Sequence, residues 1–355
     1  MTVENLGVKL YSGLKSDRVD PIYNPAWEEV DRTTLTSDGA VGGSITVSNI
    51  PTSYKYLQVL YNLKNGSNGN VMLLGRVNGS GSNYEERGIS MTGSSDTPFN
   101  YGSNDYWNMG LADGSYDSFG IQHITSQGDS QARRGIYNEC VHNGSGNSPK
   151  TRRDFLYRGD TSATTEVEAW SYGDGRAYGD GSEVVVLGLN PSATSTDDVF
   201  WKYLGGDTLT GTSDNLTTDT ITAKKYLWLQ AYVKATGDAG LNLSFNNDNA
   251  SNYIRVAAEN DSDSTSTTAA YVGLDYTAND YFFVNAYICN NASSDSLMFY
   301  DVVSASGTGA SVIPNKIWGC AKWVNTNQIT EVNIDNDETG VDYSAKSFIK
   351  VWGSD

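Results

Sequence analysis

Two histidines and three cysteines are the side chains of this sequence best suited to acid–base, nucleophilic or metal chemistry. His123 lies in residues 120–124, where polar and apolar side chains alternate as in a β-strand. His142 and Cys140 form a Cys-x-His pair, but no second pair stands at the spacing of a zinc site. A hydrolase triad needs a nucleophile, a base and an orienting acid, and the sequence selects no such set. We therefore expect two strand histidines, buried free thiols and no enzymatic activity.

An acidic loop near the C-terminus has part of the oxygen spacing of a calcium site. Asp335, Asp337 and Asp342 flank Gly340, and oxygens at alternate positions before a glycine resemble the first half of a calcium-binding loop. The twelfth position holds Lys346, where a bidentate glutamate is needed. We expect no cofactor. Calcium at these three aspartates is the one exception that the pattern allows, and a solvated turn is the simpler interpretation.

Aromatic residues among Gly, Ser, Asn and Asp make residues 98–119 the best candidate for binding. Phe99, Tyr101, Tyr106 and Trp107 fall in a stretch that is longer than its counterpart later in the chain. Exposed aromatic faces suit a protein contact or the stacking of a sugar. The alternative is that these rings pack beneath their own loop. An Arg-Gly-Asp triplet at 158–160 is of a kind that chance produces often in a chain rich in glycine and aspartate.

The composition indicates an all-β protein. The chain has 355 residues, with 37 Gly and 23 Tyr, and short apolar runs are separated by turn-forming residues. Turn signals recur at the spacing of a sandwich or jelly roll. The formal charge of −18 disfavours nucleic-acid and anionic-membrane partners, which need clustered cations. No apolar run is long enough for a transmembrane helix, and the first residues lack the pattern of a secretory signal.

An internal repeat predicts two copies of one domain. Residues 55–64 return as 225–234, 82–84 as 251–253 and 165–167 as 330–332, always in the same order. The sequence thus predicts an N-terminal arm or anchor at 1–26, a first β-sandwich or jelly-roll domain at 27–189, a linker at 190–198 and a second such domain at 199–355. The apolar side chains of the arm, Leu10, Tyr11 and Tyr23 among them, suggest that it attaches to a neighbouring subunit.

Several of these motifs resemble a known protein class. Residues 49–59, then 76–79, then Asn83 and Tyr84, resemble a β-rich domain frequent in virion proteins of tailed viruses of bacteria and archaea. Residues 5–18 resemble the opening of such proteins from marine viruses, and the second copy departs from the pattern at 223–224 and 245–247. The resemblance implies a structural protein on the outside of the particle, as a capsid decoration or a tail protein.

The expected partners follow from that resemblance and from symmetry. We expect a homo-oligomer, with a trimer as the first guess, in contact with other virion proteins. The expected location is the virion, after synthesis in the host cytoplasm. The alternative is a receptor-binding or glycan-binding module of a tail fibre or a cell surface.

Overall fold

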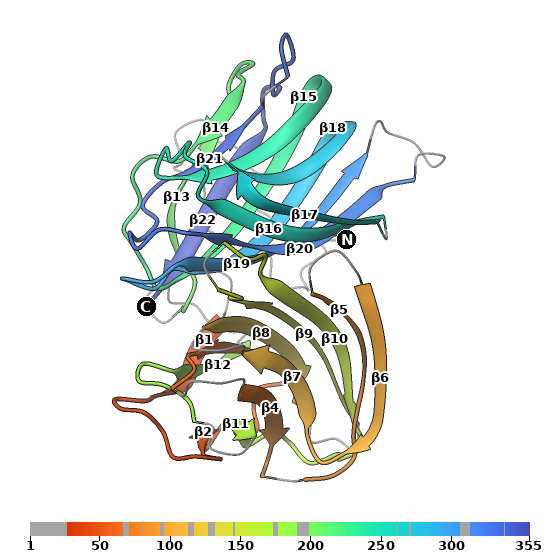
Figure 1. Ribbon diagram of the computed structural model, residues 1–355, viewed down its shortest axis with the longest axis vertical. Helices are drawn as coiled ribbons and strands as arrows, with labels where there is room; N and C mark the ends of the chain where they lie inside the picture. The colour runs from red at the N-terminus through yellow and green to blue at the C-terminus, as the bar shows by residue number, and fades with distance from the viewer. Residues whose placement is uncertain are drawn as a thin grey trace, which may run out of the picture.

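The computed structural model describes residues 27–355, apart from 67–70, 80, 93–95, 113–116, 127–131, 145, 173–176, 190–198, 261, 270, 306–312 and 337. Its regular elements are all antiparallel β-strands, arranged as two sandwiches in tandem (Figure 1). The predicted fold class is therefore confirmed. The arm at 1–26, with Leu10, Tyr11 and Tyr23, lies outside the described residues, as does the predicted linker.

The first domain pairs a large sheet with a small one. The eight-stranded sheet has the order β1-β12-β3-β8-β9-β10-β5-β6, and the four-stranded sheet has the order β2-β11-β4-β7. Alternate side chains of each sheet, such as Val59, Tyr61 and Val167, meet in a buried core between them. The strands are β1 Trp27–Thr34, β2 Ser44–Ser48, β3 Tyr56–Leu63, β4 Val71–Val77, β5 Tyr84–Met91, β6 Asp96–Asn104, β7 Trp107–Ala112, β8 Ser118–Thr125, β9 Arg133–Val141, β10 Lys150–Arg158, β11 Glu166–Tyr172 and β12 Glu183–Leu189.

The second domain repeats this order strand for strand. Its large sheet runs β13-β22-β15-β18-β19-β20-β16-β17, and β14, β21 and the outer parts of β15 and β18 form the smaller layer. Two long strands each replace a pair: β15 corresponds to β3 and β4, and β18 to β7 and β8. The strands are β13 Lys202–Thr208, β14 Asn215–Thr217, β15 Tyr226–Phe245, β16 Tyr253–Glu259, β17 Ser262–Ala269, β18 Val272–Cys289, β19 Ser296–Ala305, β20 Asn315–Trp323, β21 Val332–Asp335 and β22 Phe348–Ser354.

The two large sheets pack face to face through a third apolar core (Figure 1). Phe119 of β8 is fully buried and stacks on Tyr226 and Phe299 of the second domain, with ring centroids 6.0 and 5.6 Å apart. Trp201, just before β13, is also fully buried and donates from Nε1 to Oε1 of Gln58 at 2.9 Å. The central strands of each large sheet are thus covered on both faces, which explains why successive residues of β3 and β12 are buried without alternation.

Polar contacts surround this inter-domain core. Glu183 of β12 accepts from the Tyr226 hydroxyl at 2.7 Å and pairs with the Lys225 ammonium at 3.0 Å. His142 Nε2 lies 2.8 Å from Oδ2 of Asp295. The three cysteines, Cys140, Cys289 and Cys320, are free and buried in the same core, as the sequence predicts. The Cys-x-His pair therefore serves the domain junction: His142 contacts Asp295, and Cys140 is an apolar side chain of the core.

The shared core predicts that the two domains unfold together. Replacing Phe119 by Ala removes a fully buried ring and is expected to lower the free energy of unfolding by about 3–5 kcal/mol. Phe155→Ala is the matched control, because Phe155 lies on the same face of the same sheet but is 58% exposed, so a change of about 0.5 kcal/mol is expected. Urea unfolding followed by tryptophan fluorescence measures both. Two separated transitions, one of them unchanged by Phe119→Ala, would contradict a shared core.

Candidate binding groove at the domain junction

A groove of about 660 Å³ opens where the large sheets of the two domains stop covering each other. Strands β5, β6 and β10 form one wall and β20 of the second domain forms the other. The lining is apolar and cationic, and it contains no carboxylate among the described residues. It consists of Arg87, Gly88, Ile89, Pro98, Phe99, Asn100, Arg153, Phe155, Lys316 and Trp318.

Strand register explains why these side chains share one face. Phe155 of β10 stands opposite Arg87 of β5, which stands opposite Asn100 of β6. The next row on the same face joins Arg153, Ile89 and Pro98 in the same way. Arg87, Phe155 and Arg153 correspond to Val256, Cys320 and Trp318 of the second domain, all three of which are buried. The two domains therefore dock off centre, which leaves part of the first sheet open.

Arg153 joins the two walls of the groove. Its Nε donates to Oδ1 of Asn138 at 2.7 Å, its Nη2 pairs with Asp301 of β19, and its guanidinium carbon lies 5.0 Å from the centre of the Trp318 ring. Arg87, by contrast, is exposed and makes no ion pair with any described residue. Of the three cations that line the groove, Arg153 is therefore structural, and Arg87 is open to a ligand.

Phe99 and Tyr101, two of the four predicted binding residues, lie on the edge strand β6. Phe99 contributes to the groove, but its ring stacks on Tyr101 at 5.4 Å between centroids and lies 3.8 Å from the guanidinium carbon of Arg152. Gly88 stands opposite Phe99, and a Cβ there would lie 2.5 Å from the ring. Tyr101 is 42% exposed. The strand therefore presents aromatic surface, but not as the loop that the sequence suggested.

The other two predicted residues do not join the groove. Trp107 begins β7 and is 2% exposed within the core of the first domain, where its ring meets Tyr84 edge to face. Tyr106 is half-buried and packs edge to face on Trp170 of the small sheet. Trp107 thus follows the alternative left open by the sequence, that these rings pack within the protein, because its ring fills the space above Gly75, where no Cβ would fit. Residues 98–112 supply an edge strand and a core strand.

Buried carboxyls lie behind the groove, on the inner face of β5, β10 and the neighbouring strand β9. Glu86, Asp154 and Glu139 are each at most 3% exposed, and Arg152 is the cation among them. Arg152 Nη2 lies 3.1 Å from Oε2 of Glu86 and its Nε lies 2.5 Å from Oδ2 of Asp154. Glu139 accepts from the Tyr137 hydroxyl at 3.0 Å. The register equates these four with Arg255, Gly319, Val302 and Ile317, so the cluster belongs to the first domain alone.

Burial raises the pKa of each of these carboxyls, because the charged form loses water. The pKa of Glu86 rises to about 7, and those of Glu139 and Asp154 rise to about 8, although Arg152 opposes the shift. Asp154 also feels the negative charges of Glu86 and Glu139. Protonating one carboxyl reduces the electrostatic repulsion between the three carboxylates, which the single positive charge of Arg152 cannot neutralise.

The raised pKa values predict that stability falls as the pH rises from about 4.5 to about 8. In that window the unfolded chain has released protons that the native carboxyls still hold, so the free energy of unfolding decreases with pH. Glu139→Gln keeps the shape of the side chain and removes one titrating group. The loss of unfolding free energy between about pH 4.5 and about pH 8 is therefore expected to be smaller by an amount on the order of a few kcal/mol. Glu85→Gln, at an exposed position of β5, is the control. Thermal unfolding at several pH values tests this, and an unchanged slope in Glu139→Gln contradicts it.

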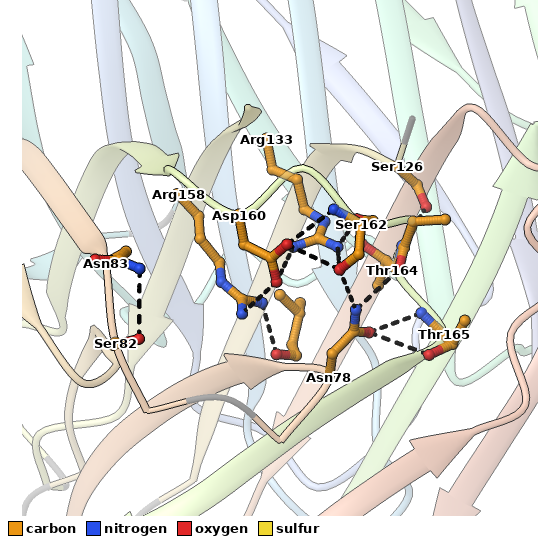
Figure 2. Close-up of polar contacts among 12 residues, drawn as sticks. Asn78, Ser82, Asn83, Ser126, Arg133, Arg158, Asp160, Ser162, Thr164 and Thr165 are labelled. Atoms are coloured by element: carbon orange, nitrogen blue, oxygen red, sulfur yellow. Dashed lines mark hydrogen bonds and ion pairs between the residues drawn. The ribbon is translucent and has the colours of Figure 1, made fainter. Parts of the chain in front are cut away.

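In each domain an asparagine side chain holds a turn against the repeated Thr-Glu-Val motif, and we call this set of hydrogen bonds the latch (Figure 2 shows the first). Asn78, in the left-handed conformation at φ 53°, accepts at Oδ1 from the amides of Thr165 and Glu166 at 2.8 and 3.2 Å. Asn246, at φ 54°, accepts from Thr330 and Glu331 at 2.8 and 3.0 Å. The latch ties the turn after one strand to the start of another, in both domains.

A buried tyrosine accompanies the latch in each domain. The Tyr84 hydroxyl accepts from the Val77 amide at 2.9 Å, and the Tyr253 hydroxyl accepts from the Phe245 amide at 2.8 Å. The repeated Asn-Tyr and Thr-Glu-Val motifs therefore hold the scaffold together.

The Arg-Gly-Asp triplet belongs to the same region and is structural (Figure 2). Arg158 is 2% exposed, donates to the Val77 carbonyl at 2.7 Å and pairs with Asp160 at 2.7 Å. Arg133, 1% exposed, lies 3.5 Å from the same carboxylate. The ion pairs of Arg133 and Arg158 with Asp160 thus hold the C-terminal end of β10 in place. The arginine of the triplet is not available to a receptor.

Removing the Asn78 side chain, which is the acceptor of the latch, is expected to destabilise the first domain. Asn78→Ala leaves the amides of Thr165 and Glu166 without their acceptor and is expected to cost about 1–3 kcal/mol in free energy of unfolding. Asn83→Ala is the matched control, since Asn83 is exposed, has φ 66° and bonds only to Ser82 through its side chain in Figure 2. Urea unfolding measures both, and equal losses would show that backbone conformation alone matters.

The structure places two of the three predicted calcium ligands. Asp335 ends β21 and is half-buried, Asp342 is half-buried in the following turn, and Asp337 lies outside the described residues. Burial and the charge of Asp214 raise the pKa of Asp335. The described residues contain no group of three or more His, Cys, Asp or Glu side chains close enough to hold a metal. Calcium at this turn stays a prediction.

His123 lies between rings of both domains. Its centroid is 6.3 Å from that of Trp27 and 6.5 Å from that of Tyr287, and burial lowers its pKa. Sequence reasoning placed it on a strand but missed the domain junction. It also missed Phe155, Trp318 and Arg87, because each lies in a regular strand and only the docking of the two domains brings them together.

No protein-family model and no curated protein matches the chain. Among solved structures, domains LG4-5 of the mouse laminin alpha1 chain align with a TM-score of 0.18 and 8% identity, over 94% of this chain and 91% of that one. The paired C2 domains of extended-synaptotagmin 2 align with a TM-score of 0.10 and 9% identity, over 82% of this chain and 99% of that one. At these scores neither structure bears on the fold or the function.

Proposed function

We propose that the protein is a non-catalytic structural protein on the outside of a tailed virus particle, as a capsid decoration or a tail-associated protein. The observation that carries the proposal is the shared core, which joins two copies of one sandwich into a single two-domain unit. Such a unit offers large surfaces to neighbours and needs no moving part. The motifs that resemble virion domains are the strands and latches of this scaffold.

The proposed partners are other virion proteins and further copies of the chain. We propose a trimer as the form of that homo-oligomer. The proposed location is the virion, after synthesis in the host cytoplasm. Within the described residues, no helix combines the length and the apolarity needed to cross a membrane. The formal charge of −18 keeps copies soluble and opposes binding to nucleic acid.

Purified particles test this function directly. Mass spectrometry of gradient-purified virions is expected to detect the protein, and cryo-electron microscopy is expected to show two-lobed density on the particle exterior. Particles from a virus that lacks the gene should lose that density and no other. Absence of the protein from purified particles, or density inside the capsid, would refute the proposal.

A second candidate function is a receptor-binding or glycan-binding module of a tail fibre or a cell surface. The observation that favours it is the groove, which has a concave, apolar lining and an exposed arginine at a domain junction. Trp107 cannot report on this function, because it is buried in the core. The variants that can report on it are those of the groove wall.

A further inference from the structure

We infer that the groove between β5, β6, β10 and β20 binds a short acidic oligosaccharide. This inference rests on the second candidate function, glycan binding, and names the class of ligand and the residues that would hold it. The carrying observation is the juxtaposition of aromatic and cationic side chains from both domains around one concavity.

The size of the groove favours a small ligand. Its volume of about 660 Å³ falls within the range of roughly 300–1,000 Å³ that is usual for small-molecule sites, and such sites occur preferentially at domain interfaces. A stable protein partner would need roughly 800 Å² of surface on each side, which favours broad surfaces over a concavity of this kind. A ligand of a few rings is therefore the better match.

The charge of the lining selects an anionic ligand. Arg87, Arg153 and Lys316 come from three different strands, and no carboxylate lines the groove, although acidic residues outnumber basic ones by 42 to 24 in the chain. Arg87 is exposed and unpaired among the described residues, so its planar guanidinium can take a carboxylate in bidentate geometry. A long polyanion would meet the repulsion of the whole protein, whereas a short oligosaccharide brings few charges.

The rings of the groove suit a sugar. Phe155 is 58% exposed on one wall, and Trp318 of the second domain lies on the other, held by the Arg153 guanidinium. The C–H faces of pyranose rings pack on such aromatic surfaces, and the exposed Asn100 amide can exchange hydrogen bonds with hydroxyls. In the proposed complex, the exposed Phe155 ring packs on a sugar ring, the buried Trp318 with Arg153 over its ring forms the opposite wall, and Arg87 recognises the acidic group.

Isothermal titration calorimetry on the full chain at low salt tests this assignment. The acidic probes are tetragalacturonate and 3′-sialyllactose, and maltotetraose and lactose are their neutral counterparts. At least one acidic probe is expected to bind more tightly than its neutral counterpart. Because Arg87→Gln removes a charge-assisted hydrogen bond to the acidic group, it is expected to weaken that binding by about tenfold or more.

Two further variants separate the groove from general effects of charge and folding. Phe155→Ser is expected to weaken binding of the acidic probe while the protein stays folded, because the side chain is largely exposed. Lys202→Gln removes one exposed cation at β13, on the opposite edge of the second large sheet, and should leave binding unchanged. Circular dichroism and urea unfolding verify that all three variants are folded.

The outcomes that overturn the inference are distinct. Failure of both acidic probes to bind, equal binding of the neutral sugars, or an unchanged affinity in Arg87→Gln each refutes it. Binding of hexaglutamate as tightly as the sugars would assign the groove to acidic peptides and also refute it. None of these results alters the presence of the protein in purified particles, so the structural function is judged separately.

Discussion

The contact between the outer faces of the two large sheets is the constraint on which the rest of the structure depends. In a lone sandwich this face of the large sheet would meet water. Here it carries Leu60, Phe119, Ile121 and Val185, each at most 1% exposed, and the second domain matches it with Trp201 and Tyr226. Burying so much apolar surface is favourable by roughly 25 cal/mol for each Å² removed from water. The two domains therefore cannot separate without exposing the apolar core between them to water.

The same contact creates the groove. The two sheets belong to copies of one fold, but they do not present equivalent rows of side chains to each other. Phe119 and Phe155 lie on one face of one sheet, and docking buries the first and leaves the second 58% exposed. Part of the first sheet is thus left uncovered next to β20. A site at this place is a consequence of off-centre docking and requires both domains.

Duplication has been followed by divergence of the interior as well as of the surface. Both domains keep the asparagine latch and the buried tyrosine beside it, since these fix the same turn in the same fold. Only the first domain buries three carboxyls around one arginine, directly behind the groove wall, where the second has Arg255, Gly319, Val302 and Ile317. Burying such groups costs more than packing apolar ones, so they are a specialisation of the first copy.

The sequence by itself determined the fold class and the duplication, because alternating strands and turn residues are local signals and the repeat preserves their order. It also identified Asn78 and the two Thr-Glu-Val repeats as motifs, but it took residues 245–247 for a departure, whereas Asn246 makes the same hydrogen bonds as Asn78. The tertiary structure decided which aromatic residues are exposed. Trp107 lies in a core although it follows a run of polar turn residues, and Phe155 faces a groove although it is the one phenylalanine of a strand rich in charged residues. Exposure of a strand residue depends on what covers its face of the sheet, and here that cover is the second domain, far along the chain and beyond the reach of any local pattern.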